Sequence, residues 1–363
     1  MKTDLRIKSI SARAVVVPMR RPLQTSTGAV NVAPLLLVDL KTSGGVVGRS
    51  YLFAISKAHL KPLAAVVDAM GEMLKGDALA PFEIEKKLRA HYTLLGVHNI
   101  VLFVMSAIDM CAWDALGQAM GKPVVQLLGG TPRPVLAYNS NGLGIQELKP
   151  LAKEAEELVA GGFTAVKLRL GRPTAAADID ALRAVKKTIG SKVTLMVDFN
   201  QALSVAEAIR RGRMIDEEGG VLWIEEPIRA DDFAGCAKVA REVATPIQIG
   251  ENFMGPEQMA QAIAAACCDY VMPDAQRIGG VTGWMRAAAL AQGAGLEMSS
   301  HLFAEASCQL LAVTPTSHWL EYVDWADPVM EEPVRIEKGR AVGAAGAGLG
   351  MKWNEKAVRK YAL

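Results

Sequence analysis

A regular alternation begins near residue 135 and constrains the fold more than any other feature of the sequence. Short runs rich in β-branched residues are separated by Ala-rich stretches with helical periodicity. Strands joined through crossover helices lie parallel, and eight such strands in series favour a closed barrel over an open sheet. The predicted strands are 135–139, 164–170, 193–200, 221–227, 246–252, 270–276, 296–303 and 318–323.

The residues before the barrel have a different pattern, which is typical of an α+β domain. After residue 324 the alternation stops, and a Gly- and Ala-rich tail follows, which we expect to pack on the first domain. The predicted units are therefore an N-terminal α+β domain (1–130), a catalytic barrel (131–324) and a C-terminal segment (325–363). In the first unit we expect strands at 7–18, 34–40 and 44–52, a polar connector at 23–31, and helices at 60–74, 84–92 and 100–119.

Composition narrows the class of protein. Hydrophobic residues make up 51% of the 363 residues, enough for a large core. The net charge is only +2 with no basic stripe, which argues against a nucleic-acid partner. The N-terminus lacks the apolar core of a signal peptide, and the apolar runs fall short of the ~20 residues that cross a membrane. The five cysteines lack C-x-x-C spacing, so we expect free thiols in a cytoplasmic protein.

Polar side chains end seven successive predicted strands. The carboxyl ends of barrel strands are where active sites of this architecture are built, and strand residues two apart share a face. A single charge at a strand end is usually only solvated, but seven strands in a row indicate a site. The residues are Lys167, Arg169, Asp198, Asn200, Glu225, Glu226, Glu251, Asn252, Asp274, His301 and Glu321.

Three of these acids come from adjacent strands. Asp198, Glu225 and Glu251 would repel one another at one barrel mouth, and a divalent cation would remove that conflict. Oxygen-only ligands suit Mg²⁺, with Mn²⁺ as the alternative. The structural alternative is that each acid pairs with a basic neighbour.

A proton acceptor is predicted on the neighbouring strands. Asp274 can orient His301 and raise its basicity, which makes a carboxylate–imidazole dyad. Lys167 and Arg169 would approach from the opposite side of the mouth. A carboxylate substrate held between these groups and the metal could lose its α-proton and give a metal-stabilised enediolate.

These residues lie in motifs that resemble the mandelate racemase branch of the enolase superfamily over nearly the whole chain. The resemblance implies a modified (β/α)₇β TIM-type barrel under an α+β capping domain. Each motif is short, but their order and spacing together are specific. They are Ile108-Asp-Met-Cys-Ala-Trp-Asp, Met196-Val-Asp-Phe-Asn-Gln, Trp223-Ile-Glu-Glu-Pro, Gly250-Glu-Asn, Met272-Pro-Asp-Ala, Ile278-Gly-Gly-Val-Thr-Gly-Trp, Ser299-Ser-His-Leu-Phe and His318-Trp-Leu-Glu.

Roles follow from the resemblance residue by residue. It implies that Asp198, Glu225 and Glu251 bind magnesium, that Lys167 contacts the substrate carboxylate, and that His301 is one α-proton base with Asp274 as its partner. It further implies that Glu321 hydrogen-bonds the enediolate and that Asn200 and Ser140 make polar contacts. The lid residues it suggests are Leu23, Thr27, Val30, Phe53 and Ile55, with Leu302 and Val323 on the barrel wall.

One motif departs from the family pattern. Mandelate racemase has Lys-x-Lys on the second strand, where this chain has Lys167-Leu-Arg169, and a guanidinium is a poor base. The mostly apolar lid favours an aryl or alkyl 2-hydroxy acid over a sugar acid, although simple domain packing would also explain it.

The sequence leaves three hypotheses for the function, two of them enzymatic. The leading prediction is a racemase of an apolar 2-hydroxy acid, with His301 serving one face and Arg169 serving the other weakly or through water. The alternative is an acid-sugar dehydratase that uses His301 as its base. A non-catalytic barrel is the third hypothesis, and the complete set of acids, base and metal ligands argues against it. We expect a homo-oligomer, and similar enzymes suggest an octamer.

Overall fold

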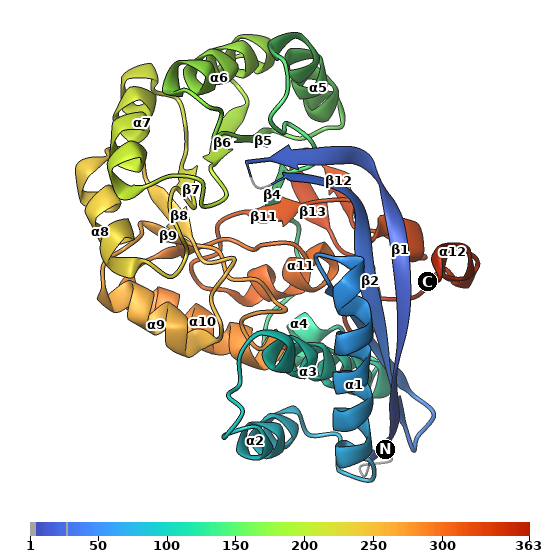
Figure 1. The fold of residues 1–363 in the computed structure, drawn as a ribbon. Helices are drawn as coiled ribbons and strands as arrows, with labels where there is room; N and C mark the ends of the chain where they lie inside the picture. The colour runs from blue at the N-terminus through green and yellow to red at the C-terminus, as the bar shows by residue number, and fades with distance from the viewer. Residues whose placement is uncertain (1–4, 27) are drawn as a thin grey trace.

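The N-terminal third forms a three-stranded antiparallel sheet with helices on one face (Figure 1). This computed structural model describes residues 5–26 and 28–363. Apolar residues of the first helix recur three or four apart, at Leu60, Leu63, Val67 and Met70, and pack on the sheet. The elements of this cap are β1 (Ile7–Thr25), β2 (Gly28–Thr42), β3 (Val47–Phe53), η1 (Lys57–His59), α1 (Leu60–Leu74), α2 (Pro81–His91), α3 (Asn99–Met120) and α4 (Val124–Leu127).

The segment 23–31, predicted as a connector, is instead the end of a long hairpin. Leu23 pairs with Val30 and Thr25 with Gly28, after a register shift that follows Pro18. The tip reaches the barrel, where Gln24 O accepts from Ile145 N at 2.7 Å. Apolar and polar residues alternate only weakly in the segment 23–31. The physical reason is that this part of the hairpin covers a cavity, so neither of its faces lies in a hydrophobic core. Thr27 lies outside the described residues.

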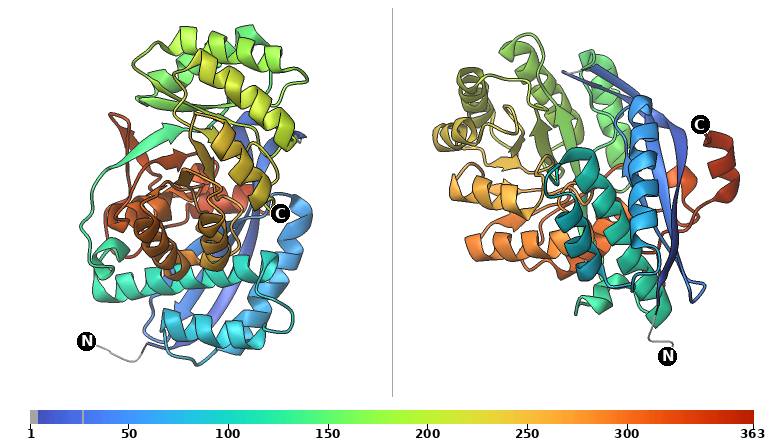
Figure 2. Two further views of the ribbon diagram at one scale, coloured as in Figure 1. Left: turned by 90° about the vertical axis from the view of Figure 1, so that its left-hand side faces the viewer. Right: turned by 60° about the horizontal axis from the view of Figure 1, so that its bottom comes forward.

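The second part is a closed barrel of parallel strands with helices outside it (Figure 2). The strands β4 to β10 pair in sequence order, and β11 pairs with β4. Between β10 and β11 the ring closes through Met298 N to Thr316 O at 2.8 Å and Ser300 N to Trp319 O at 2.9 Å. The expected (β/α)₇β fold with a capping domain is confirmed. The strands are β4 (Val135–Asn139), β5 (Ala165–Arg169), β6 (Thr194–Asp198), β7 (Ile224–Glu225), β8 (Ile247–Ile249), β9 (Tyr270–Val271), β10 (Glu297–Met298) and β11 (Leu320–Tyr322).

Each barrel strand except the last is followed by a helix of the outer layer. Their buried apolar faces, with the β-branched strand residues beneath them, form the largest hydrophobic core of the molecule. The helices are α5 (Leu148–Ala160), α6 (Ala175–Ile189), α7 (Val205–Glu218), α8 (Phe233–Glu242), α9 (Pro256–Ala264), α10 (Gly280–Ala294) and α11 (Ala304–Val313).

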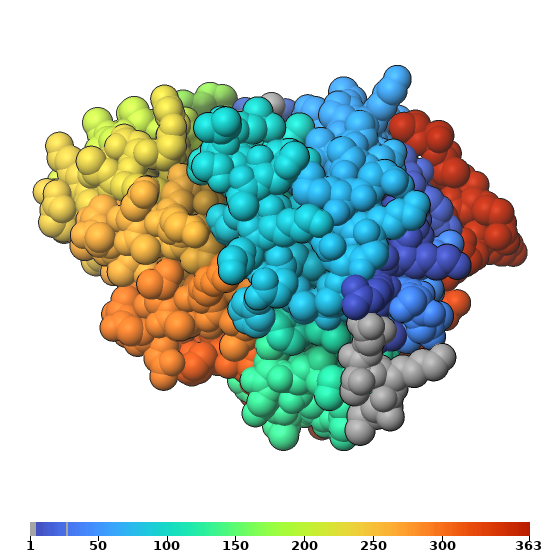
Figure 3. Space-filling view, turned by 90° about the horizontal axis from the view of Figure 1, so that it is seen from below, coloured from blue at the N-terminus to red at the C-terminus, as the bar shows by residue number. Residues whose placement is uncertain are grey.

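The C-terminal segment contacts both parts. It contains η2 (Asp327–Val329), β12 (Arg335–Glu337), β13 (Arg340–Val342) and α12 (Glu355–Tyr361). Strand β13 pairs antiparallel with β4, and α12 packs on β1. Trp353 Nε1 donates to Asp39 Oδ1 on β2 at 2.7 Å. In Figure 3 this red segment lies beside the blue strands of the cap, on the side away from the yellow and orange barrel helices.

Helix α3 lies where cap and barrel meet. Among the described helices, α3 alone is long and apolar enough to cross a membrane by length and composition. It is mostly buried inside the protein, as the core helix of a globular domain is. No apolar run of that length was expected from the sequence. Asp109 on α3 accepts from Thr282 Oγ1 of α10 at 2.5 Å, and Trp113 Nε1 donates to the same hydroxyl at 3.0 Å. Helix α3 is therefore apolar on all sides because it packs against the cap and the barrel together.

Candidate active site

A cavity of about 280 Å³ lies at the carboxyl ends of the barrel strands, under the cap. Polar side chains from the strands form one part of its wall, and apolar side chains from the hairpin and β3 form another. Most residues predicted from the sequence meet here; Ser140 and Glu225 do not line the cavity but lie behind it. The predicted residues on the wall are Leu23, Val30, Phe53, Ile55, Lys167, Arg169, Asp198, Asn200, Glu226, Glu251, Asn252, Asp274, His301, Leu302, Glu321 and Val323.

Lys167 stands at the centre of the acidic part. Its side chain is only 1% exposed, and its Nζ lies 3.2 Å from Asp198 Oδ2 and 2.8 Å from Glu321 Oε1, with Glu225 in closer contact. Burial alone would lower the pKa of Lys167, but Glu225 and Glu321 raise it well above its usual value. The side chain is therefore a fixed ammonium that can bind a carboxylate.

The oxygen donors around this ammonium fit a hard divalent cation. Asp198 and Glu225 are directly paired in the β6–β7 register, and Glu251 follows β8. Two buried oxygens beside them, Glu226 Oε2 and Asn200 Oδ1, have no hydrogen-bond partner among residues 5–26 and 28–363. Such uncompensated oxygens are costly unless a cation, its water ligands or a substrate hydroxyl satisfies them.

The acids do not yet form a coordination shell in this arrangement. In the described part of the chain, no three Asp, Glu, His or Cys side chains are placed closely enough to hold an ion. Asp198 instead accepts from Asn200 Nδ2 at 3.0 Å, and Glu225 turns to Lys167 and Trp223. A cation bound here would therefore compete with Lys167 and the Asn200 amide for these carboxylates.

The predicted dyad is present. His301 Nδ1 lies 2.6 Å from Asp274 Oδ2, and Asp274 Oδ1 accepts from the backbone of Gln276 and Arg277 at 2.7 and 3.1 Å. With Nδ1 donating to the carboxylate, Nε2 is left as the proton acceptor. It faces the acidic cluster, 3.4 Å from Glu251 Oε2.

The charge of His301 depends on its acidic neighbours. Burial lowers its pKa, whereas Glu251 and Glu321 raise it, and the result is a pKa of about 10. A divalent cation bound by Glu251 would offset part of that negative charge and bring the pKa of His301 down toward the range of a neutral base.

Arg169 does not have the environment of a base. Its Nη1 donates to the carbonyl oxygens of Ser140 and Gly142 at 3.1 and 2.9 Å, and Nη2 donates to Ser140 Oγ at 3.1 Å. These contacts use the N–H groups of the guanidinium as donors and fix the loop after β4. The expectation that Arg169 serves the second face of the substrate is therefore not supported by its geometry.

Several wall residues were missed by the sequence analysis. Trp325 follows β11 and packs on Phe53 of the cap, with ring centroids 5.2 Å apart. Gln276 and Arg277 also line the cavity. Their positions directly after strand-end acids were the available signal. Only the three-dimensional structure shows that they face inward.

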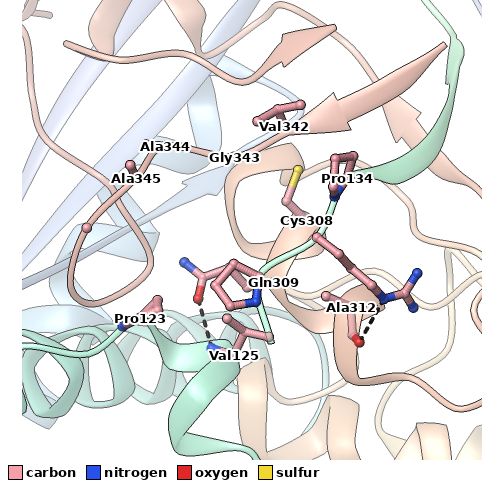
Figure 4. A pocket seen from close by; sticks show the side chains of 13 residues that line it. Pro123, Val125, Pro134, Cys308, Gln309, Ala312, Val342, Gly343, Ala344 and Ala345 are labelled. Carbon is pink, nitrogen blue, oxygen red and sulfur yellow. Dashed lines mark hydrogen bonds between the residues drawn. The ribbon is translucent and has the colours of Figure 1, made fainter. Parts of the chain in front are cut away.

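A second cavity, of about 330 Å³, lies away from these groups (Figure 4). Its wall is mostly apolar and contains no acid, with Val125 N donating to Gln309 Oε1 at 2.9 Å and Arg133 reaching the end of α11. It offers no arrangement for proton transfer or for a divalent cation.

Comparison with known proteins identifies the family. Residues 8–129 match the model of the mandelate racemase/muconate lactonizing enzyme N-terminal domain, and residues 150–357 match that of the enolase C-terminal domain-like family. The chain belongs to the enolase superfamily. Several solved relatives contain bound magnesium, and the oxygen-rich site is consistent with this cofactor.

The relatives of this enolase-superfamily chain catalyse several reactions. It is 29% identical to an L-talarate/galactarate dehydratase from Salmonella typhimurium, over 99% of this chain and 92% of that protein. It is 30% identical to a 3,6-anhydro-alpha-L-galactonate cycloisomerase from Streptomyces coelicolor, over 89% and 90% of the two chains.

Two solved structures are more similar. An enolase from an alpha proteobacterium with bound magnesium is 43% identical, with a TM-score of 0.97 over 99% of this chain and 100% of that one. An enolase from Bradyrhizobium complexed with magnesium and mandelic acid is 41% identical, with a TM-score of 0.96 over the whole of both chains.

Proposed function

We propose that the protein removes the α-proton of a 2-hydroxy carboxylate with an aryl or other apolar substituent, and that it acts as a mandelate-racemase-like racemase. The observation that carries this proposal is the division of the cavity wall. Lys167, His301 and the acids occupy one part, and Phe53 and Trp325 with other apolar side chains occupy the other. The mandelic acid in the Bradyrhizobium relative is an acid of the proposed shape.

The chain's own residues divide the chemistry. Lys167 and Glu321 hold the substrate carboxylate and keep its α-carbon opposite His301. Nε2 of His301 takes the α-proton, while Asp274 holds the ring and stabilises the imidazolium that forms. Racemisation also needs a proton on the opposite face of the α-carbon, which a water molecule beside Arg169 delivers in this proposal. Asp198, Glu225 and Glu251 are the proposed ligands of magnesium, with Asn200 as a further polar contact. The bound ion supplies positive charge that lowers the energy of the anion left by the proton.

Dehydration of an acid sugar is the second candidate. It is favoured by the hydrogen bonds of Arg169, because they leave His301 as the base and elimination of a β-hydroxyl needs proton transfer on one face only. The L-talarate/galactarate dehydratase relative shows that the superfamily includes this reaction.

Deuterium exchange distinguishes the two candidates. The magnesium-loaded protein would be incubated in D₂O with single enantiomers of mandelate-like acids and, separately, with acid sugars, and the products followed by NMR and chiral chromatography. Racemisation predicts deuterium at Cα together with the opposite enantiomer. Dehydration predicts a 2-keto product from the sugars and no inversion of the aryl acids. A protein that exchanges no α-proton in either series would contradict the proposed function.

The variant Arg169→Lys tests the second face. A lysine can lose its proton and act as a base, whereas the guanidinium cannot, so racemase activity on mandelate-like acids is expected to rise by about tenfold. Circular dichroism of one enantiomer would follow the rate. The exposed Arg183→Lys is the matched control. No gain in the Arg169 variant would count against racemisation and in favour of elimination.

A further inference from the structure

One barrel side chain binds the edge of the cap sheet. Strand β3 is the outer strand of the order β1-β2-β3, and the neighbouring Ala54 N already donates to Pro34 O of β2. Phe53 therefore points its backbone groups outward. Gln276, only 2% exposed, satisfies both: Phe53 N donates to its Oε1 at 2.8 Å, and its Nε2 donates to Phe53 O at 3.3 Å.

The backbone of the same residue is tied to the proposed base. The backbone N of Gln276 donates to Asp274 Oδ1 at 2.7 Å, and Asp274 Oδ2 binds His301 Nδ1 at 2.6 Å. The Asp274 carboxylate therefore holds the His301 imidazole through one oxygen. Through its other oxygen it holds Gln276, the residue that binds the cap. The backbone part of this connection does not depend on which side chain residue 276 carries.

The residue held by Gln276 forms the apolar wall. The Phe53 ring faces the cavity and packs on Trp325, with centroids 5.2 Å apart and planes inclined by 44°. Trp325 lies in the segment that follows β11, whereas Phe53 belongs to the cap. The aromatic pair is therefore complete only when β3 is docked on the barrel.

We propose that Gln276 is a positioning residue that docks Phe53 against Trp325 and thereby selects substrates with an aryl or bulky apolar substituent. This inference rests on the proposed function for the identity of the substrate. Gln276 would determine which substrates bind by connecting the cap to the loop that follows Asp274. His301, the proposed base, would keep its position and its role.

The test uses Gln276→Leu in the full-length, magnesium-loaded protein. The substitution removes both bonds to Phe53 but keeps the backbone bond to Asp274. We expect KM for mandelate-like acids to rise about tenfold, with kcat and the KM for lactate, a small 2-hydroxy acid, changed less than about twofold. Gln276→Glu retains an acceptor for Phe53 N and should recover part of the loss. The exposed Gln261→Leu on α9 is the control.

Hydrogen exchange provides a readout that does not need turnover. The Phe53 amide should exchange faster in Gln276→Leu than in the wild-type protein and the control, while amides of the barrel strands stay unchanged. Unchanged protection of Phe53, or an equal rise in KM for mandelate-like acids and lactate, would overturn the inference. If the wild-type protein acts on neither acid, the proposed function fails and the specificity claim with it, and the exchange data still decide whether Gln276 docks the cap.

Discussion

His301→Gln is expected to reduce α-proton exchange by about 10³-fold, within the range that a positioned general base contributes. The glutamine cannot take up the proton, although it can occupy a similar volume beside Asp274. Loss of the substrate Cα–H signal in D₂O measures the step directly. The exposed His91→Gln on α2 is the matched control and should behave like the wild-type protein.

Asp274→Asn separates base strength from base orientation. An amide can still lie beside Nδ1, but it no longer stabilises the imidazolium, so exchange should fall less than in His301→Gln and remain measurable. If His301→Gln kept exchange near the wild-type rate, the base would have to be another residue and the dyad would be only structural.

Asp198→Asn is expected to weaken Mg²⁺ binding by at least about tenfold and to remove most activity. The reason is electrostatic, since loss of one of the converging carboxylates reduces both the ligand set and the repulsion that a cation relieves. Calorimetric titration with Mg²⁺ measures the affinity. The exposed Asp180→Asn on α6 provides a control with the same change in charge.

Thermal unfolding checks the same prediction without substrate. A ligand at 100 times its Kd stabilises the folded protein by about 2.7 kcal/mol, so Mg²⁺ should raise the Tm of the wild-type and Asp180→Asn proteins. The Asp198→Asn protein should show little rise at the same Mg²⁺ concentration. Equal stabilisation of all three would mean that the ion binds elsewhere or that Asp198 is not a ligand.

The barrel could be predicted because its signals are local and repeated. A strand such as Thr194–Asp198 is a short, mostly apolar run followed by an amphipathic helix, and the acid at its end marks the mouth. Asp198 and Glu225 could be brought together in this way because parallel strands place their carboxyl ends at one edge.

The cap and the wall were harder to predict for a physical reason. The hairpin residues near Leu23 and Val30 cover a cavity, so they lack the strict alternation of a strand that packs on a core. The contacts of Gln276 with Phe53 and of Trp325 with the same ring join residues distant in sequence. No local pattern distinguishes them from surface residues.

For Arg169, the sequence predicts the chemistry of the side chain but not its contacts. Its guanidinium was predicted to be a poor base from residue type alone. The structure adds that it holds Ser140 and Gly142 at the end of β4, which explains how an arginine can be accommodated there. That contact depends on a loop conformation that strand patterning does not specify.

The most direct test of the central claim is an anomalous diffraction map of crystals grown with Mn²⁺ and a mandelate-like acid. The account predicts one strong peak bounded by Asp198, Glu225 and Glu251, with the α-carbon of the acid facing His301 Nε2. A peak away from these carboxylates, or a His301 ring turned from the α-carbon, would contradict it.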